Sequence, residues 1–175
     1  MRALLIAVLL AVTACGVPAE VPAGTPQVTL SATDLAFADL LIPQNESALA
    51  ALALTASRPD SALRPLAEQV EARYRDELAQ VRAVLAEAGK PESDQHEGHD
   101  MPGMITAAEL AAAAHADPAA FDGQLATLLR GQFEEARTVA RAEREAGTSA
   151  ALLELSTRID STRAEFLALL KDAQR

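Results

Sequence analysis

The sequence is poor in the residues that form disulfides, metal clusters and aromatic cores. Its 175 residues include no tryptophan, one tyrosine, one cysteine and three histidines. A single cysteine rules out an internal disulfide and a multi-cysteine metal site, so a folded domain must be stabilised by its own apolar core. Phosphate-binding glycine loops, the Gly-x-Ser-x-Gly elbow and the paired Glu-x-x-His of di-iron bundles are also absent from the sequence. We therefore expect no catalytic centre, and expect that the protein is not an enzyme.

Basic residues are too few to balance the acidic ones. The 15 lysines and arginines stand against 25 aspartates and glutamates, which gives a formal net charge of −10. Such a charge repels phosphate backbones, and we expect no nucleic-acid partner. The sequence also lacks a polybasic stretch for binding anionic lipid, so any membrane attachment must come from another source.

The N-terminus has the features of an export signal. Arg2 is followed by an apolar run that is too short to span a bilayer, and small residues then precede Cys15. This pattern resembles the lipobox of bacterial lipoproteins, in which the cysteine receives a diacylglycerol group (palmitate being a typical acyl chain) and becomes the new N-terminus. We predict a signal peptide over residues 1–14, lipidation of Cys15 and attachment to the extracytoplasmic face of a membrane, at the cell surface or in the periplasm. The alternative is an ordinary secretory signal in which the cysteine is incidental.

Residues 15–30 are predicted to form a flexible spacer after the lipid anchor. Proline and glycine recur there and disfavour a helix. Residues 31–175 form the predicted domain, whose length suits a single core.

Alanine and leucine dominate this domain and no strand alternation occurs, which favours an all-α fold. We predict long helices over residues 33–56, 62–88 and 118–147 and from residue 148 or 149 onward, with a kink at Pro43. Thr106 and Glu109 form a predicted capping box that opens a short helix. On the last helix, one apolar stripe is predicted: Leu152, Leu155, Ile159, Thr162, Phe166 and Leu169. Its spacing is typical of a four-helix bundle, here built from two similar helical hairpins joined by a long connection.

The domain resembles the exported bacterial family named domain of unknown function 305. The resemblance rests on the order and spacing of several short segments: residues 34–37, 41–43, 66–70, 77–85, the His/Met-containing connection and residues 121–130. It implies a ferritin-like helical bundle. It also implies a link to copper, since some family members bind copper or confer tolerance to it.

The sequence departs from the family at the two places where members carry a His-His pair. Here those positions hold Gln44-Asn45 and Gly131-Gln132. An amide is a poor ligand for copper or zinc, so a metal site of the family type should be missing. Helical spacing points Gln44 and Gln132 inward, and we predict a structural pair in which the two amides hydrogen-bond to each other.

The connection over residues 89–105 contains the main chemical signal. His96, His99, Met101 and Met104 lie there, and imidazole and thioether are ligands that suit copper, methionine especially Cu(I). We predict a weak copper site formed by these four residues. The alternative is a solvated linker with incidental histidines, because short His-rich tracts are compositional evidence alone.

Two functions follow from these observations. One is a membrane-tethered lipoprotein that binds or handles copper weakly through the His/Met loop. The other is a metal-free helical module that interacts with, or acts as a scaffold for, another protein of the cell envelope.

Overall fold

The computed structural model describes residues 28–93, 96 and 99–174. Its helical elements are α1 (Ala32–Leu52), the 3-10 helix η1 (Ala53–Ser57), α2 (Arg64–Glu87), α3 (Ala107–Ala114), α4 (Pro118–Ala146) and α5 (Ala150–Ala173). This described part contains no strand, and the all-α prediction is confirmed. None of its helices is both long enough and apolar enough to cross a membrane. The predicted signal peptide, Cys15 and most of the predicted spacer lie outside the described residues.

Local sequence signals explain most of the helix boundaries. A capping box starts α1, in which the Ser31 hydroxyl accepts from the Asp34 amide and the Asp34 carboxylate accepts from the Ser31 amide. The predicted box of Thr106 and Glu109 starts α3 in the same way. Helix α1 continues unbroken past Pro43 and passes into η1, so the first predicted helix corresponds to α1 and η1 together.

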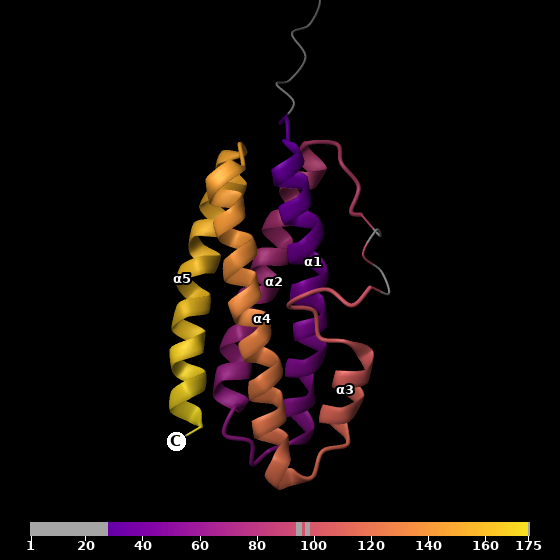
Figure 1. Ribbon diagram of the computed structural model, residues 1–175, viewed down its shortest axis with the longest axis vertical. Helices are drawn as coiled ribbons and strands as arrows, with labels where there is room; N and C mark the ends of the chain where they lie inside the picture. The colour runs from indigo at the N-terminus through magenta and orange to yellow at the C-terminus, as the bar shows by residue number, and fades with distance from the viewer. Residues whose placement is uncertain (1–27, 94–95, 97–98, 175) are drawn as a thin grey trace, which may run out of the picture.

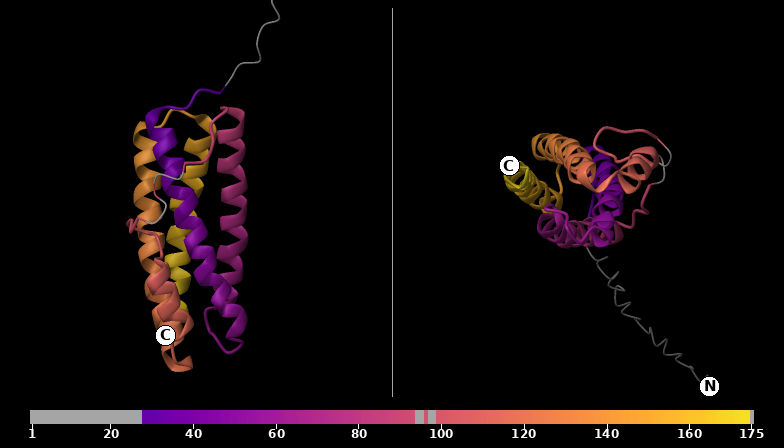
Figure 2. Two further views of the ribbon diagram at one scale, coloured as in Figure 1. Left: turned by 90° about the vertical axis from the view of Figure 1, so that its right-hand side faces the viewer. Right: turned by 90° about the horizontal axis from the view of Figure 1, so that it is seen from below.

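The four long helices form an elongated bundle (Figure 1). Each hairpin, α1 with α2 and α4 with α5, is antiparallel, and further contacts join α1 to α4 and α2 to α5 (Figures 1 and 2). The connection from α2 to α4 returns along the side of the bundle and contains α3, which packs on α1 and α4. One long crossover between two hairpins is the ferritin-like arrangement that the sequence predicts.

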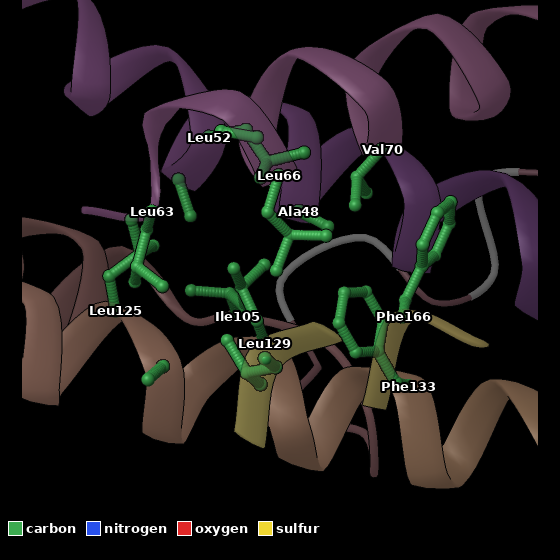
Figure 3. Packing of buried hydrophobic residues seen from close by; sticks show 14 of the residues in the cluster. Ala48, Leu52, Leu63, Leu66, Val70, Ile105, Leu125, Leu129, Phe133 and Phe166 are labelled. Carbon is green, nitrogen blue, oxygen red and sulfur yellow. The ribbon is translucent and has the colours of Figure 1, made fainter. Parts of the chain in front are cut away.

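The core consists of two apolar clusters, one above the other along the bundle. The cluster nearer the C-terminus of α5 includes Leu52, Val70, Leu129 and Phe166, and the loop residue Ile105 inserts among them (Figure 3). The other cluster is formed by residues such as Phe37, Leu85, Val139 and Leu152. Each long helix has a buried polar side chain close to the point where it passes from one cluster to the other.

The buried stripe of α5 differs from the prediction in its second half. Leu152, Leu155, Ile159 and Phe166 are buried as expected, but Arg163 and Leu170 take the places assigned to Thr162 and Leu169. Leu169 is 42% exposed. The prediction alternates steps of three and four residues along the whole helix. A straight α-helix has 3.6 residues per turn, so steps of four are slightly more frequent, and beyond Ile159 the buried face passes through Arg163 and Leu170.

Candidate functional site

The middle of the bundle contains the polar layer, which we define as Asn45, Tyr74, Glu77, Gln132 and Arg163. All five side chains are buried, and they come from all four long helices. Each sits where the apolar stripe of its helix passes from one cluster to the other. The layer therefore links the four helices at one height.

An ion pair between α2 and α5 forms the centre of the layer. The guanidinium of Arg163 donates to both Glu77 oxygens, at 2.8 and 2.6 Å. Asn45 joins the pair from α1, because its Nδ2 donates to Glu77 at 3.0 Å and its Oδ1 accepts from Arg163 at 3.2 Å. The Tyr74 ring lies 4.0 Å from the Arg163 guanidinium carbon, which is a cation–π distance. Both charges are thus paired and hydrogen-bonded, as burial requires.

Tyr74 extends the layer to α4. Its hydroxyl donates to Oε1 of Gln132, and burial raises the pKa of Tyr74, so the phenol remains protonated. The structure buries this tyrosine completely. Nε2 of Gln132 has no hydrogen-bond partner among the described residues.

Gln44 and Gln132 are both buried, as the sequence predicts, but they do not hydrogen-bond to each other. Gln132 pairs with Tyr74, and Nε2 of Gln44 donates instead to the Pro102 carbonyl at 3.0 Å. The prediction that the two amides bond to each other was wrong. Each glutamine bonds to a different segment, and the spacing of residues within one helix does not show which other segment lies beside it.

The end of the His/Met loop is anchored against the bundle. Besides the bond from Gln44, the Ile105 amide donates to the Ser47 hydroxyl at 3.1 Å. Gly103 has a φ of 78°, and a Cβ there would lie 2.7 Å from the Glu135 Cβ. Only glycine fits this close approach without strain. The anchor fixes Met104 beside α4, where it lines a cavity together with Gln132.

The four predicted copper ligands lie on two successive turns of the loop. The His99 amide donates to the His96 carbonyl at 3.1 Å, and the Met104 amide donates to the Met101 carbonyl at 3.0 Å. The His96 and His99 ring centroids are 6.5 Å apart. Burial raises the pKa of Asp39 on α1, and the charge of His96 opposes this shift. Among the described residues, no group of three or more histidine, cysteine, aspartate and glutamate side chains is placed to hold a metal.

The positions of the family's histidines do not fit a metal in this chain. Asn45 is committed to Glu77 and Arg163, Gln44 to the loop and Gln132 to Tyr74. The amide oxygens of Asn45 and Gln132 accept hydrogen bonds within the layer, and amides bind copper poorly. A copper site at those positions is therefore excluded by the donor set.

A second buried polar cluster lies at the end of the bundle where α1 begins. The Asp34 carboxylate accepts from the Thr148 amide at 2.9 Å, the Thr148 hydroxyl at 2.8 Å and the Ser149 amide at 3.0 Å. Burial favours a higher pKa for Asp34, but these bonds and those from Ser31 hold it well below its ordinary value. The cluster ties the first turn of α1 to the turn between α4 and α5.

Glu143 of α4 is buried beside this cluster. Neither of its carboxyl oxygens has a donor within the described part of the chain. Burial, together with the neighbouring Asp34 carboxylate, raises the pKa of Glu143 to about 8. The raised pKa favours the neutral, protonated form of this buried carboxyl.

Five buried polar residues of these two clusters were not predicted as partners from the sequence: Asp34, Asn45, Glu77, Glu143 and Arg163. A signal was present, since Glu77 and Arg163 continue the apolar stripes of α2 and α5, where a solvated charge is out of place. Their partners could not be read from spacing, because Asn45 and Arg163 are 118 residues apart.

The chain matches the family model named domain of unknown function (DUF305) over residues 34–173. It belongs to this family. Among solved structures, a DUF305 fragment from Deinococcus radiodurans is similar, with a TM-score of 0.74, 20% identity and coverage of 83% of this chain and 97% of the fragment. A DUF305 protein from Streptomyces coelicolor, assigned as secreted, gives a TM-score of 0.72 at 18% identity, over 80% of this chain and 90% of that protein. At such identities the likeness concerns the fold alone. Among curated proteins, none matches the chain.

Proposed function

We propose that this DUF305 protein is an extracytoplasmic lipoprotein, anchored through Cys15, that binds copper weakly through His96, His99, Met101 and Met104. The role is one of binding and handling rather than catalysis. The acyl chains on Cys15 supply the membrane affinity, since each buried methylene contributes about 0.8 kcal/mol. Export is supported by the N-terminal sequence and by the assignment of the Streptomyces coelicolor relative as secreted.

The spacing of the two loop histidines carries the copper proposal. A histidine nitrogen lies about 2.0–2.1 Å from a bound metal ion. Two imidazoles on opposite sides of one ion therefore have ring centroids about 6 Å apart, close to the 6.5 Å between His96 and His99. Two nitrogen ligands in this arrangement suit Cu(I), and the thioethers of Met101 and Met104 follow within five residues.

A Cu(I) competition titration tests this proposal. The protein is the full chain with Cys15→Ser, because a free thiol would itself bind Cu(I). A chromogenic chelator reports the copper that the protein removes. We expect about one Cu(I) per chain, lost when His96, His99, Met101 and Met104 are all changed to alanine. His115→Ala is the matched control, since this histidine lies outside the loop and should leave binding unchanged.

A second candidate is a metal-free interaction or scaffold module of the envelope. It is favoured by the structural commitment of Gln44, Asn45 and Gln132 at the positions where family members carry histidines. If the starting protein takes no copper from the chelator, or if the fourfold variant takes as much, the copper proposal is wrong and this candidate replaces it.

A further inference from the structure

A groove runs along α4 between α3 and the anchored end of the His/Met loop. It consists of two adjoining cavities, of about 370 and 180 Å³, which share Glu109, Thr127 and Leu128. The larger cavity extends toward the start of α4 and is mainly apolar, with Ala112, Ala120 and Gly123 among its walls. The smaller cavity extends to Met104 and Gln132. We call the two together the α3–α4 groove; α3 contacts α4, and Figure 2 shows it against this half of the helix.

The floor of the groove is made of small residues on one face of α4. Gly123, Thr127 and Gly131 are spaced by four and therefore line up along the helix. A Cβ added at Gly123 or at Gly131 would meet nothing within 4 Å. Neither glycine is thus required by packing inside the described protein, although glycine inside a helix is less stable than alanine. What both glycines provide is open space.

Gln132 lies at one end of the groove, and the N–H groups of its side chain are available to a ligand there. Its side chain is 1% exposed, and its Oε1 accepts from the Tyr74 hydroxyl. Its Nε2 has no acceptor within the described chain. A buried N–H group without a partner is unfavourable. A ligand oxygen at this end of the groove would supply the missing acceptor.

The charge of the walls selects the kind of ligand. Glu109 is the charged residue that both cavities share, and no lysine or arginine is among the described lining residues. A carboxylate or phosphate would face the Glu109 carboxylate without a compensating cation. The residues from Gly123 to Gln132 span roughly 13 Å along α4 at 1.5 Å per residue, which suits an extended aliphatic chain of medium length.

We propose that the α3–α4 groove binds a neutral amphipathic small molecule, a medium-chain acyl amide, ester or alcohol. Its oxygen accepts from Nε2 of Gln132 and its aliphatic chain lies over Gly123 and Thr127. Met104 lines the groove and is also one of the four proposed copper ligands. The groove proposal uses Gly123, Thr127, Glu109 and Gln132 and does not depend on the copper proposal.

Octanamide is the probe, titrated into the full chain with Cys15→Ser and followed by amide chemical shifts in NMR spectra. We expect saturable shifts centred on α3 and α4, with a Kd on the order of 1 mM for so small a ligand. Gly123→Leu fills the apolar cavity and should weaken binding at least tenfold. Ala142→Leu, on an exposed part of α4, is the matched control and should leave the Kd unchanged. Leucine favours a helix over glycine, so the Gly123 variant should fold, which its circular dichroism and Tm will verify.

A charge test separates this site from general hydrophobic adsorption. Octanoate should bind at least tenfold more weakly than octanamide, and Glu109→Gln should bring the two affinities within about threefold of each other. Glutamine retains the capping box of α3, so the substitution removes charge and keeps the helix. The proposal is overturned if octanamide causes no saturable shift, if Gly123→Leu binds it as well as the control does, or if octanoate binds the starting protein equally well.

Discussion

Arg163 is the largest side chain that the bundle buries completely. Its charge is opposed by burial but stabilised by Tyr74 and Glu77, and the net effect raises its pKa. One of its nitrogens, Nε, has no acceptor in the described structure. The residue is therefore stable in the core only while its carboxylate partner and the amide of Asn45 remain in place.

Removing that carboxylate should be among the most damaging single changes. We expect Glu77→Ala to lower the free energy of unfolding by about 3–5 kcal/mol, because it leaves Arg163 buried without a counter-charge. Glu68→Ala breaks the exposed pair with Arg64 and should change stability by less than about 1 kcal/mol. Urea denaturation of both variants measures the difference. Similar small losses in the two variants would show that the buried pair is not needed for stability.

Glu143 should make the protein less stable as the pH rises. Its pKa is about 8 in the folded chain, against 4.5 for an ordinary glutamate. A raised pKa means that the folded state holds a proton that the unfolded state releases. The contribution is therefore complete below about pH 4.5, declines through neutral pH and is gone above about pH 8.

The free energy of unfolding should accordingly fall by a few kcal/mol between pH 5 and pH 9. In Glu143→Gln, which cannot ionise, this fall should be largely removed, and urea denaturation at each pH compares the two. Asp34 has the opposite sign, because its depressed pKa gives stability that is present above about pH 4 and lost in acid. Equal pH profiles for the variant and the starting protein above pH 5 would contradict a raised pKa of Glu143.

At the scale of elements, the connection between α2 and α4 combines an anchored end with an exposed part. Its last residues are held by Gln44, Ser47 and the insertion of Ile105 into the core, whereas His99 and Asp100 are exposed. The anchor depends on a backbone conformation at Gly103 that other residues rarely adopt.

Gly103→Ala should release this anchor. A methyl group would combine a positive φ with a close contact to Glu135, and we expect a loss of about 1–3 kcal/mol in the free energy of unfolding. Hydrogen exchange of the Ile105 amide, which donates to Ser47, should accelerate. Gly123→Ala is the matched control, since the added Cβ meets open space within a helix and should stabilise by about 0.5–1 kcal/mol. Unchanged exchange at Ile105 in Gly103→Ala would refute the anchoring role.

Helix existence and type were predictable from local signals, whereas the exact face was not. The apolar stripe of α2 is buried along the helix, from Leu66 through Tyr74 to Leu85. On α5, a fixed three-four spacing drifts from the true helical period, so Leu170 replaces Leu169 in the core. A periodic sequence pattern thus predicts the buried face of a helix well over a few turns and less well over the full length of the helix.

For the whole molecule, the sequence predicts the four-helix arrangement because two hairpins and a long connection leave few ways to bury the apolar stripes. It predicts that Gln44 and Gln132 lie inside, but not what they bind. Their partners, Pro102 and Tyr74, are 58 residues away in each case. Polar contacts of this kind depend on how the helices and the connecting loop are positioned along one another in the folded bundle, and no local sequence pattern determines that.

The hydrogen bonds between Asp34 and the turn from α4 to α5 also determine how the bundle would respond to a pulling force. A pull on the chain from its N-terminal side reaches the bundle at the first turn of α1, where Asp34 is bonded to Thr148 and Ser149. Tension is therefore shared with a segment 114 residues away in sequence, through three hydrogen bonds to one carboxylate that must break before α1 can separate from this turn. The first turn of α1 is therefore held by the second hairpin as well as by its own helix.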